Sequence, residues 1–387
     1  MRHKNTGDTG LKEQIFQKID KTPAKAISFA DFMELALYEP DLGYYSQPGR
    51  VIGRQSGDFY TSVSVGKCFG LLLGYAIEAE WEKNGSPGTW LIVEQGAHDG
   101  QLAFDILDGL KNRGSSLLDH LSYHVIEAHQ ARRDFLIARI EDSDHSERVK
   151  VANTAGEVQN PQQKSTAGIF LCNELVDAFP VHRITLKNSQ WQEIWVKQGG
   201  TPSGFEISYQ EITNPDLLAE ASRLNKEEFP ENYTTEINLA MHPWLDSIRN
   251  LFADQGGHFW IIDYGHLEEQ YYSPERREGT LRCYHQHRAS DDPFVMPGEC
   301  DITAHVNFTR LADYAQQAGL QCQTLQDQHD FLTHAAKSWL LGMEAEQKTQ
   351  EPDNKKLLRQ FQTLTHPGMM GRAFKVLKLQ SSGADRI

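Results

Sequence analysis

The sequence of 387 residues is short of three things: long apolar runs, paired cysteines and basic residues. No run reaches the roughly 18 apolar residues of a membrane-spanning helix, so we expect no membrane span. Its five cysteines include no C-x-x-C pair. That scatter argues against a disulfide framework and against a structural zinc site.

The charge balance is acidic, because 38 Lys and Arg face 53 Asp and Glu, which gives a net charge of −15. A surface of this sign repels phosphate backbones and anionic lipids, so we expect no nucleic-acid partner. The same surface would attract a basic partner. The oligomeric state stays open, with a homodimer among the alternatives.

The start of the chain, "MRHKNTGDTGLKEQIF", is polar and contains Asp8 and Glu13. It has neither the apolar core of a signal peptide nor the acid-poor, Arg-rich bias of a transit peptide. These features predict a cytoplasmic protein.

From Trp90 onward, short apolar strands alternate with amphipathic helices, a pattern that predicts an α/β fold. We expect a Rossmann-like, mostly parallel sheet with helices on both faces. The expected strands cover residues 90–94, 123–128, 149–153, 168–174 and 258–265, with a late antiparallel pair at 320–326 and 373–380.

Two further regions complete the predicted organisation. Residues 1–85 form a helical N-terminal region whose Gly-, Pro- and Tyr-rich loop would cover a site, and residues 86–387 form the Rossmann-like domain. An insert at about residues 181–255 separates the fourth strand from the fifth. It reads as a hairpin over 182–200 followed by a helix over 214–229.

The stretch "LIVEQGAHDG" joins the first strand to its helix through Gly96 and Gly100, with His98 between them. Glycines let the backbone approach a ligand, and the helix start points amides at it. The acid just before the turn, Glu94, disfavours a phosphate but suits an ammonium or sulfonium ligand such as S-adenosylmethionine. A dinucleotide loop and a plain turn are the alternatives.

Acids also follow the second and fourth strands. Glu127 ends the second strand, where a carboxylate can accept both ribose hydroxyls, and a solvated strand end is the alternative. In "CNELVDAFP", Asn173, Glu174 and Asp177 crowd the end of the fourth strand. Two carboxylates there can bind a guanidinium and orient its nitrogen for reaction. The alternative is a helix start with Asp177 as a first-turn acid.

Three histidines, His266, His285 and His287, lie close in the sequence. Their spacing has no supporting cysteine or carboxylate pattern, so we expect no metal site.

Together these stretches resemble the MidA family over about residues 27–379. The resemblance rests on motifs in the same order: "LGYY", "GDFYTS", "EQGAHDGQLAFDIL", "NELVDAFPVHR", "IIDYG", "GTLR", "PGECDITAHVNF" and "GRAFKVL". It implies a class I methyltransferase fold, S-adenosylmethionine as cofactor and an exposed arginine of a protein substrate as acceptor. The mitochondrial members of this family are respiratory complex I assembly factors that methylate an arginine of a complex I subunit.

The resemblance also implies roles for individual residues. Around the cofactor it places Glu94, Gly96, His98, Gly100, Glu127 and Asn153. It places Asn173, Glu174 and Asp177 by the transferred methyl group, Asp263 and Tyr264 on the far side, and a lid made of Gly57, Asp58, Phe59, Tyr60 and Thr61.

The chain departs from the family pattern at three places: Ala97 and His98 stand for Pro and Gly, Val63 and Ser64 for Pro and Glu, and Ala152 and Asn153 for an aromatic residue and His. These departures support a second hypothesis, a non-catalytic assembly or binding protein with a degenerate cofactor loop. A methyltransferase with a small-molecule or RNA acceptor is a third, although the acidic charge disfavours RNA. We favour the protein arginine methyltransferase.

Overall fold

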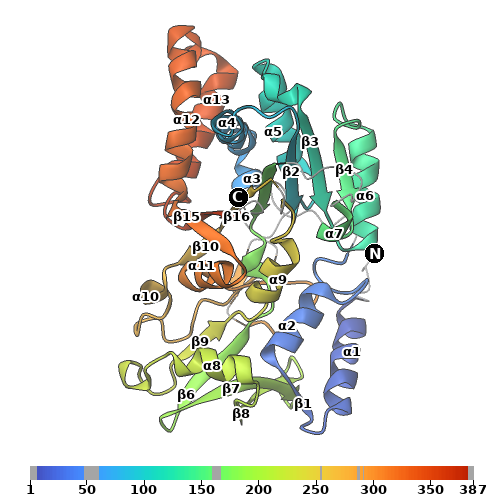
Figure 1. The fold of residues 1–387 in the computed structure, drawn as a ribbon. Helices are drawn as coiled ribbons and strands as arrows, with labels where there is room; N and C mark the ends of the chain where they lie inside the picture. The colour runs from blue at the N-terminus through green and yellow to red at the C-terminus, as the bar shows by residue number, and fades with distance from the viewer. Residues whose placement is uncertain are drawn as a thin grey trace.

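The computed structural model describes residues 7–47, 61–158, 167–252, 255–285, 288–290 and 292–381. They form two main sheets, and Figure 1 shows the second sheet, with α1, α2 and α8, at the bottom of the view, below the first. The predicted lid residues Gly57, Asp58, Phe59 and Tyr60 lie outside the described residues, as does His287.

The first sheet carries the predicted fold. Its strand order is β15-β16-β10-β5-β2-β3-β4, with the short β14 (Val306–Asn307) paired to β10. The strands are β2 (Trp90–Gln95), β3 (Leu121–Ile126), β4 (Val149–Ala152), β5 (Gly168–Asn173), β10 (Gly257–His266), β15 (Leu320–Asp327) and β16 (Phe374–Ser381). Neighbours from β4 to β10 are parallel, and β16 is antiparallel to both β10 and β15. The predicted mostly parallel sheet with a late antiparallel pair is confirmed.

The order of the strands reverses between β2 and β5, which lie side by side at the centre of this sheet. From β2 the chain proceeds outward to β3 and β4, and it then returns to the other side of β2 as β5. A crevice forms beyond the carboxyl ends of strands at such a reversal, and ligands bind there. Those ends are Gln95 of β2 and Asn173 of β5.

Helices cover both faces of this sheet. The α-helices are α1 (Gly7–Lys21), α2 (Phe29–Tyr38), α3 (Ser62–Val65), α4 (Cys68–Lys83), α5 (Gln101–Asn112), α6 (Gln130–Glu141), α7 (Ala155–Val158), α8 (Pro215–Ser222), α9 (Met241–Ile248), α10 (Glu268–Tyr271), α11 (Phe308–Gln317), α12 (Gln328–Ala345) and α13 (Pro352–Thr365). Four short 3-10 turns are η1 (Ser116–Asp119), η2 (Val176–Ala178), η3 (Lys226–Glu228) and η4 (Lys348–Gln350). One core contains apolar residues of α4, α5 and α12, and the other contains those of α9 and α11.

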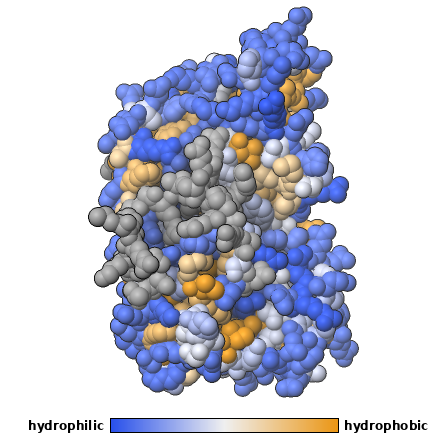
Figure 2. All heavy atoms as spheres, turned by 180° about the vertical axis from the view of Figure 1, so that it is seen from behind, coloured by the Kyte–Doolittle hydropathy of each residue, from blue (hydrophilic) through white to orange (hydrophobic). Residues whose placement is uncertain are grey.

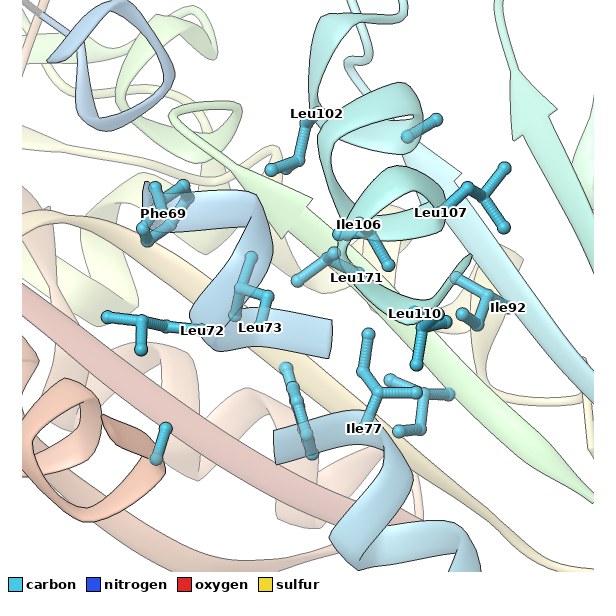
Figure 3. Packing of buried hydrophobic residues seen from close by; sticks show 14 of the residues in the cluster. Phe69, Leu72, Leu73, Ile77, Ile92, Leu102, Ile106, Leu107, Leu110 and Leu171 are labelled. Atoms are coloured by element: carbon cyan, nitrogen blue, oxygen red, sulfur yellow. The ribbon is translucent and has the colours of Figure 1, made fainter. Parts of the chain in front are cut away.

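The contact between α4 and α5 is the centre of the first core. Figure 3 shows Phe69, Leu72, Leu73 and Ile77 of α4 among side chains of α5, β2 and β5. The helices approach closely at Gly70, where an added Cβ would lie 2.5 Å from the Cβ of Asp105. A glycine at this position therefore sets the distance between the two helices.

The second sheet combines distant parts of the sequence. It contains β1 (Ala26–Ser28), β6 (His182–Lys187), β7 (Gln190–Gln198), β8 (Phe205–Glu211) and β9 (Thr234–Ile237), and β1 pairs with β7 of the insert. Buried residues of α1 and α2 pack with this insert, whereas those of α4 pack on the first sheet. The region 1–85, which the sequence predicts as one helical region, thus divides between two hydrophobic cores.

The insert also differs from prediction in its helix over 214–229, which is wrong in length. The helix α8 ends at Ser222, and the separate turn η3 follows. Asn225 explains the break, because its side chain accepts a hydrogen bond from the backbone N–H of Glu227 and so begins a new turn.

A third, antiparallel sheet is formed by β11 (Arg282–His285), β12 (Arg288–Ser290) and β13 (Asp301–Thr303).

The described helices include none with the length and apolar character needed to cross a membrane. On the face seen in Figure 2, the coloured surface is mostly hydrophilic, and hydrophobic residues gather in separate small patches.

Two helical glycines give a matched test of this packing. Gly70→Ala should lower the free energy of unfolding by about 1–3 kcal/mol, because its Cβ overpacks against α5. Gly342→Ala in α12 should raise it by roughly 0.5–1 kcal/mol, since no atom lies near its Cβ and alanine favours the helix. Urea unfolding of both variants checks the pair, and equal effects would contradict the close approach of α4 and α5.

Candidate active site

The loop after β2 is built from left-handed residues. Gly96, His98 and Gly100 have φ angles of 80°, 51° and 76°. The N–H of Gly100 donates to the carbonyl of Ala97 (2.8 Å), which closes the turn before α5 begins. His98 adopts the conformation that glycine would favour, at a cost on the order of 1 kcal/mol. The loop therefore keeps its shape without its central glycine.

Asp99 holds this loop against α6. Its carboxylate binds the guanidinium of Arg139, accepts the backbone N–H of Gln101 (3.1 Å) and lies 3.8 Å from Nδ1 of His98. Burial opposes ionisation of Asp99, but hydrogen bonds from His98 and Arg139 hold its pKa well below the usual range. His98 is thus placed beside a charged carboxylate at the edge of the loop.

A cavity of about 790 Å³ lies beyond the ends of β2, β3 and β5. The predicted site residues that line it are Thr61, Glu94, Gly96, His98, Glu127, Asn173 and Glu174. Among the predicted residues that the structure describes, five do not line it: Gly100, Asn153, Asp177, Asp263 and Tyr264. Seven residues from the ends of separate strands and from α3 therefore share one space, as the reversal of strand order requires.

Glu94 lies beneath the loop. Its carboxyl group is buried and accepts a hydrogen bond from the hydroxyl of Tyr123 (2.6 Å). Burial raises the pKa of Glu94 to about 7, against the opposing effect of the Tyr123 hydrogen bond.

Glu127 follows β3 and points one oxygen at each of two neighbours. Oε1 accepts the backbone N–H of His129 (2.9 Å), and Oε2 lies 3.9 Å from Nε of Arg132. Asn153, just after β4, accepts a hydrogen bond from Arg133 (2.8 Å) and does not line the cavity. Of these two predicted residues, Glu127 is the one that lines the cavity.

Glu174 is held in an unusual backbone conformation, with φ at 53°. Its Oε1 accepts hydrogen bonds from the backbone N–H of Ser62 (2.9 Å) and from Nδ2 of Asn173 (2.9 Å). Oε2 of Glu174 and Oδ1 of Asn173 are buried and have no hydrogen-bond partner among the described residues. Two oxygen atoms of residues that line the cavity thus have no hydrogen-bond partner, and the Glu174 oxygen can only accept a hydrogen bond once its carboxyl group is ionised.

Asp263, near the end of β10, holds the backbone that follows Glu174. Its Oδ2 accepts the backbone N–H groups of Leu175 (3.2 Å), Val176 (2.9 Å) and Asp177 (3.2 Å), and its Oδ1 accepts that of Tyr264 (2.8 Å). Burial raises the pKa of Asp263 to about 7, although these N–H groups lower it. One carboxyl group therefore determines the path of the chain just after Glu174.

Burial, and for Asp177 and Glu174 also neighbouring carboxyl groups, raises the pKa of the acids in this part of the structure. Burial and the neighbouring charges of Asp263, Glu174 and Asp301 hold the pKa of Asp177 well above its usual range. Burial, with further contributions from Asp263 and Asp301, raises the pKa of Glu174 to about 8. Among the described residues, no basic side chain forms an ion pair with Glu174, Asp177 or Asp263.

Two tyrosines of the N-terminal region also line the cavity, and sequence reasoning missed their role. The hydroxyl of Tyr38 donates to the carbonyl of Ala178 (2.9 Å), and that of Tyr45 donates to Oδ1 of Asp301 (2.8 Å). Their rings stack with centroids 5.6 Å apart. The motifs "LGYY" and "DITAHV" contain Tyr45 and Asp301, but no spacing in the sequence brings them together.

The histidines considered for a metal site have other neighbours. His266 accepts a hydrogen bond from Arg276 (3.2 Å), and His285 bonds the carbonyl of Glu299 (3.0 Å). Within the described part of the chain, no cluster of three or more His, Cys, Asp or Glu is arranged to hold a metal ion.

Comparison with known proteins gives a consistent result. A family model described as "Putative S-adenosyl-L-methionine-dependent methyltransferase" matches residues 72–326. The chain is 27% identical over 395 residues to the Drosophila melanogaster "Protein arginine methyltransferase NDUFAF7 homolog, mitochondrial", covering 97% of this chain and 85% of that protein. It is 25% identical to the Homo sapiens protein of the corresponding name, covering 96% and 83%.

A solved structure matches the whole fold. It is a Burkholderia thailandensis protein bound to S-adenosyl-homocysteine, 26% identical, with a TM-score of 0.80 and coverage of 100% of this chain and 96% of that one. The class I fold that the sequence predicts is confirmed by this match. The cytoplasmic location expected from the N-terminal sequence is wrong, because the relatives are named as mitochondrial proteins.

The raised pKa of Glu174 makes a prediction about stability. An unfolded glutamate ionises near its ordinary pKa of 4.5, whereas the folded one ionises at about 8. The contribution of Glu174 to the free energy of unfolding is therefore fully present below the pKa of the unfolded state. It is lost as the pH rises through the pKa of the folded state, at no more than about 1.4 kcal/mol per pH unit. Glu174→Gln cannot ionise and should escape this loss.

Urea unfolding of both proteins at several pH values between about 5 and 9 gives the difference between their free energies of unfolding. The titration of the histidines, which both proteins share, cancels in this difference. We expect the wild-type protein to lose stability relative to Glu174→Gln as the pH rises. A difference that does not change with pH would show that Glu174 ionises normally.

Proposed function

This chain belongs to the family of S-adenosyl-L-methionine-dependent methyltransferases whose model matches it, and we propose that the group it methylates is the guanidinium of an arginine in another protein. The observation that carries this proposal is the pair of unpartnered, buried acceptor atoms on Asn173 and Glu174. A guanidinium carries five N–H donors and no acceptor, so it complements such a pair.

The cavity suits the cofactor of the family. Its volume of about 790 Å³ lies within the range of roughly 300–1,000 Å³ that is usual for ligand sites. In this proposal, Gly96 and His98 contact the cofactor from the loop, Glu94 lies beneath it, and Glu127 binds the ribose hydroxyls. An added Cβ at Gly96 would lie 3.1 Å from the side chain of Leu175, so glycine fits this position better than a residue with a side chain.

When bound, S-adenosylmethionine supplies a methyl group on a cationic sulfur, and transfer breaks the S–C bond and forms an N–C bond to the acceptor. Glu174 accepts an N–H of the guanidinium at Oε2 and aligns the reacting nitrogen. The incoming positive charge lowers the pKa of Glu174, so its carboxyl group ionises as the acceptor binds. It can then take the proton that the methylated nitrogen loses.

The carboxyl groups in and near the cavity favour a cationic acceptor such as arginine over a neutral one. Asp177 does not line the cavity, and burial with the neighbouring carboxyl groups raises its pKa, so in this proposal it acts only through its effect on Glu174. Thr61, the N-cap residue just before α3, also lines the cavity. The relatives are named protein arginine methyltransferases, which supports an arginine acceptor, and a respiratory complex I subunit is the first candidate that the MidA resemblance offers.

Transfer of labelled methyl groups tests the proposal. The purified protein is incubated with methyl-labelled S-adenosylmethionine and the protein extract of cells that lack it, and the labelled protein is hydrolysed to amino acids. We expect label in methylarginine. The rate of transfer should fall by about a hundredfold or more in Glu174→Gln, since a positioned acid–base group contributes a factor of that order to the rate.

Calorimetric titration with S-adenosylmethionine provides the controls. Glu174→Gln should bind the cofactor, whereas Gly96→Arg should not, because a long side chain there would enter the cavity. Label in lysine or in small molecules would contradict the arginine acceptor. A folded wild-type protein that does not bind the cofactor would support the non-catalytic binding protein instead.

A further inference from the structure

The C-terminal helices reach Glu174 through a chain of hydrogen bonds. Nε2 of Gln328, the first residue of α12, donates to the carbonyl of Leu364 in α13 (3.1 Å). Oε1 of Gln328 accepts a hydrogen bond from the hydroxyl of Ser62 (3.2 Å). The backbone N–H of Ser62 in turn donates to Oε1 of Glu174 (2.9 Å). Two helices far along the sequence are thus linked through Ser62 to the carboxyl group proposed to bind the acceptor.

Gln328 and Ser62 are both 0% exposed. A buried amide is costly unless its polar atoms are bonded, so packing alone does not favour glutamine here. Because both amide atoms of Gln328 have partners, its side chain has one fixed orientation. Neither residue lines the cavity, so neither can contact a substrate.

The helix α3 that Ser62 begins is only one turn long. Thr61 and Ser64 close it by a capping box, and Thr61, Val63 and Ser64 line the cavity. A single turn has little stability of its own, so its position depends on its contacts. The hydrogen bond from Ser62 to Gln328 is the polar contact that joins this turn to α12.

From this geometry we infer that Gln328 is a positioning residue, which holds Ser62 so that the Ser62 N–H fixes Oε1 of Glu174 and leaves Oε2 directed to the acceptor. The inference rests on the proposed function for its effect on methyl transfer. Its structural part, the dependence of the Glu174 position on Gln328, stands independently.

Gln360 supplies a matched control. It is also a buried glutamine of the C-terminal helices, 9% exposed, and its Oε1 accepts the backbone N–H of Cys68 (3.1 Å). That bond joins α13 to α4, and within the part of the chain that the structure describes neither of its two side chains is hydrogen-bonded to Glu174 or Ser62. Gln360→Met therefore removes a comparable buried hydrogen bond from the same helical pair and leaves the Ser62–Gln328 hydrogen bond in place.

The experiment compares Gln328→Met, Ser62→Ala, the double variant and Gln360→Met. The probe is the extract protein of the transfer assay at one subsaturating concentration, so that initial rates compare kcat/KM. We expect Gln328→Met and Ser62→Ala each to lower the rate by about three- to tenfold, the change expected for loss of one hydrogen bond. The double variant should be no slower than Gln328→Met, because both changes break one chain of contacts.

Two readouts separate positioning from general destabilisation. The Kd for S-adenosylmethionine, measured by calorimetry, should be unchanged in every variant, and Gln360→Met should stay within about twofold of wild type, as for a substitution outside a coupled network. A fall in rate for Gln360→Met as large as that for Gln328→Met would overturn the inference. Ser62→Ala keeps the test available if Gln328→Met does not fold.

Crystal structures of the variants test the structural part without any acceptor. In Gln328→Met, the bond between the Ser62 N–H and Glu174 should lengthen beyond the 2.9 Å seen here. An unchanged bond would overturn the inference. A displaced Glu174 with an unchanged rate would instead overturn the proposed role of Glu174, so the two failures are distinguishable.

Discussion

The site depends on one carboxyl group that does not itself line the cavity. Asp263 accepts three consecutive backbone N–H groups, those of residues 175–177, and so turns the chain sharply after β5. That turn leaves Glu174 with a left-handed backbone, and its side chain lies where Ser62 and Asn173 can bond it. Because Asp263 comes from β10, the adjacent parallel strand, the register of the sheet decides where the Glu174 carboxyl group lies. A buried N–H without a partner costs roughly 1–3 kcal/mol, so this carboxyl group is hard to replace.

The sequence predicts the first sheet well because its strands are apolar, short and separated by helices of clear period. The pattern also predicts the proposed ligand site, since Glu94, Glu127 and Asn173 all lie at or just after the ends of such strands. Parallel strands align these ends at one edge of the sheet, so their proximity needs no knowledge of side-chain packing. The family match then confirms the class of reaction that the loop and the acids predicted.

Contacts between distant segments account for what the sequence did not reveal. The pairing of β1 with β7 joins residue 26 to residue 197, and only three residues of β1 take part. Tyr45 meets Asp301 and Gln328 meets Ser62 through folds of the chain that no periodic pattern encodes. His98 is a different case, because the sequence shows a missing glycine but not that the φ angle of 51° is tolerated there.

The account as a whole requires that Glu174 be a carboxyl group that is neutral in the free protein and ionises when a cation arrives. Side-chain carbon-13 NMR of glutamate-labelled protein measures this directly, with the Glu174→Gln spectrum identifying the signal. We expect the carboxyl carbon of Glu174 to titrate with a midpoint at about 8 in the free protein. A midpoint near the ordinary value of 4.5 would contradict the account, because the acceptor site would then already be charged and solvated before any cation bound.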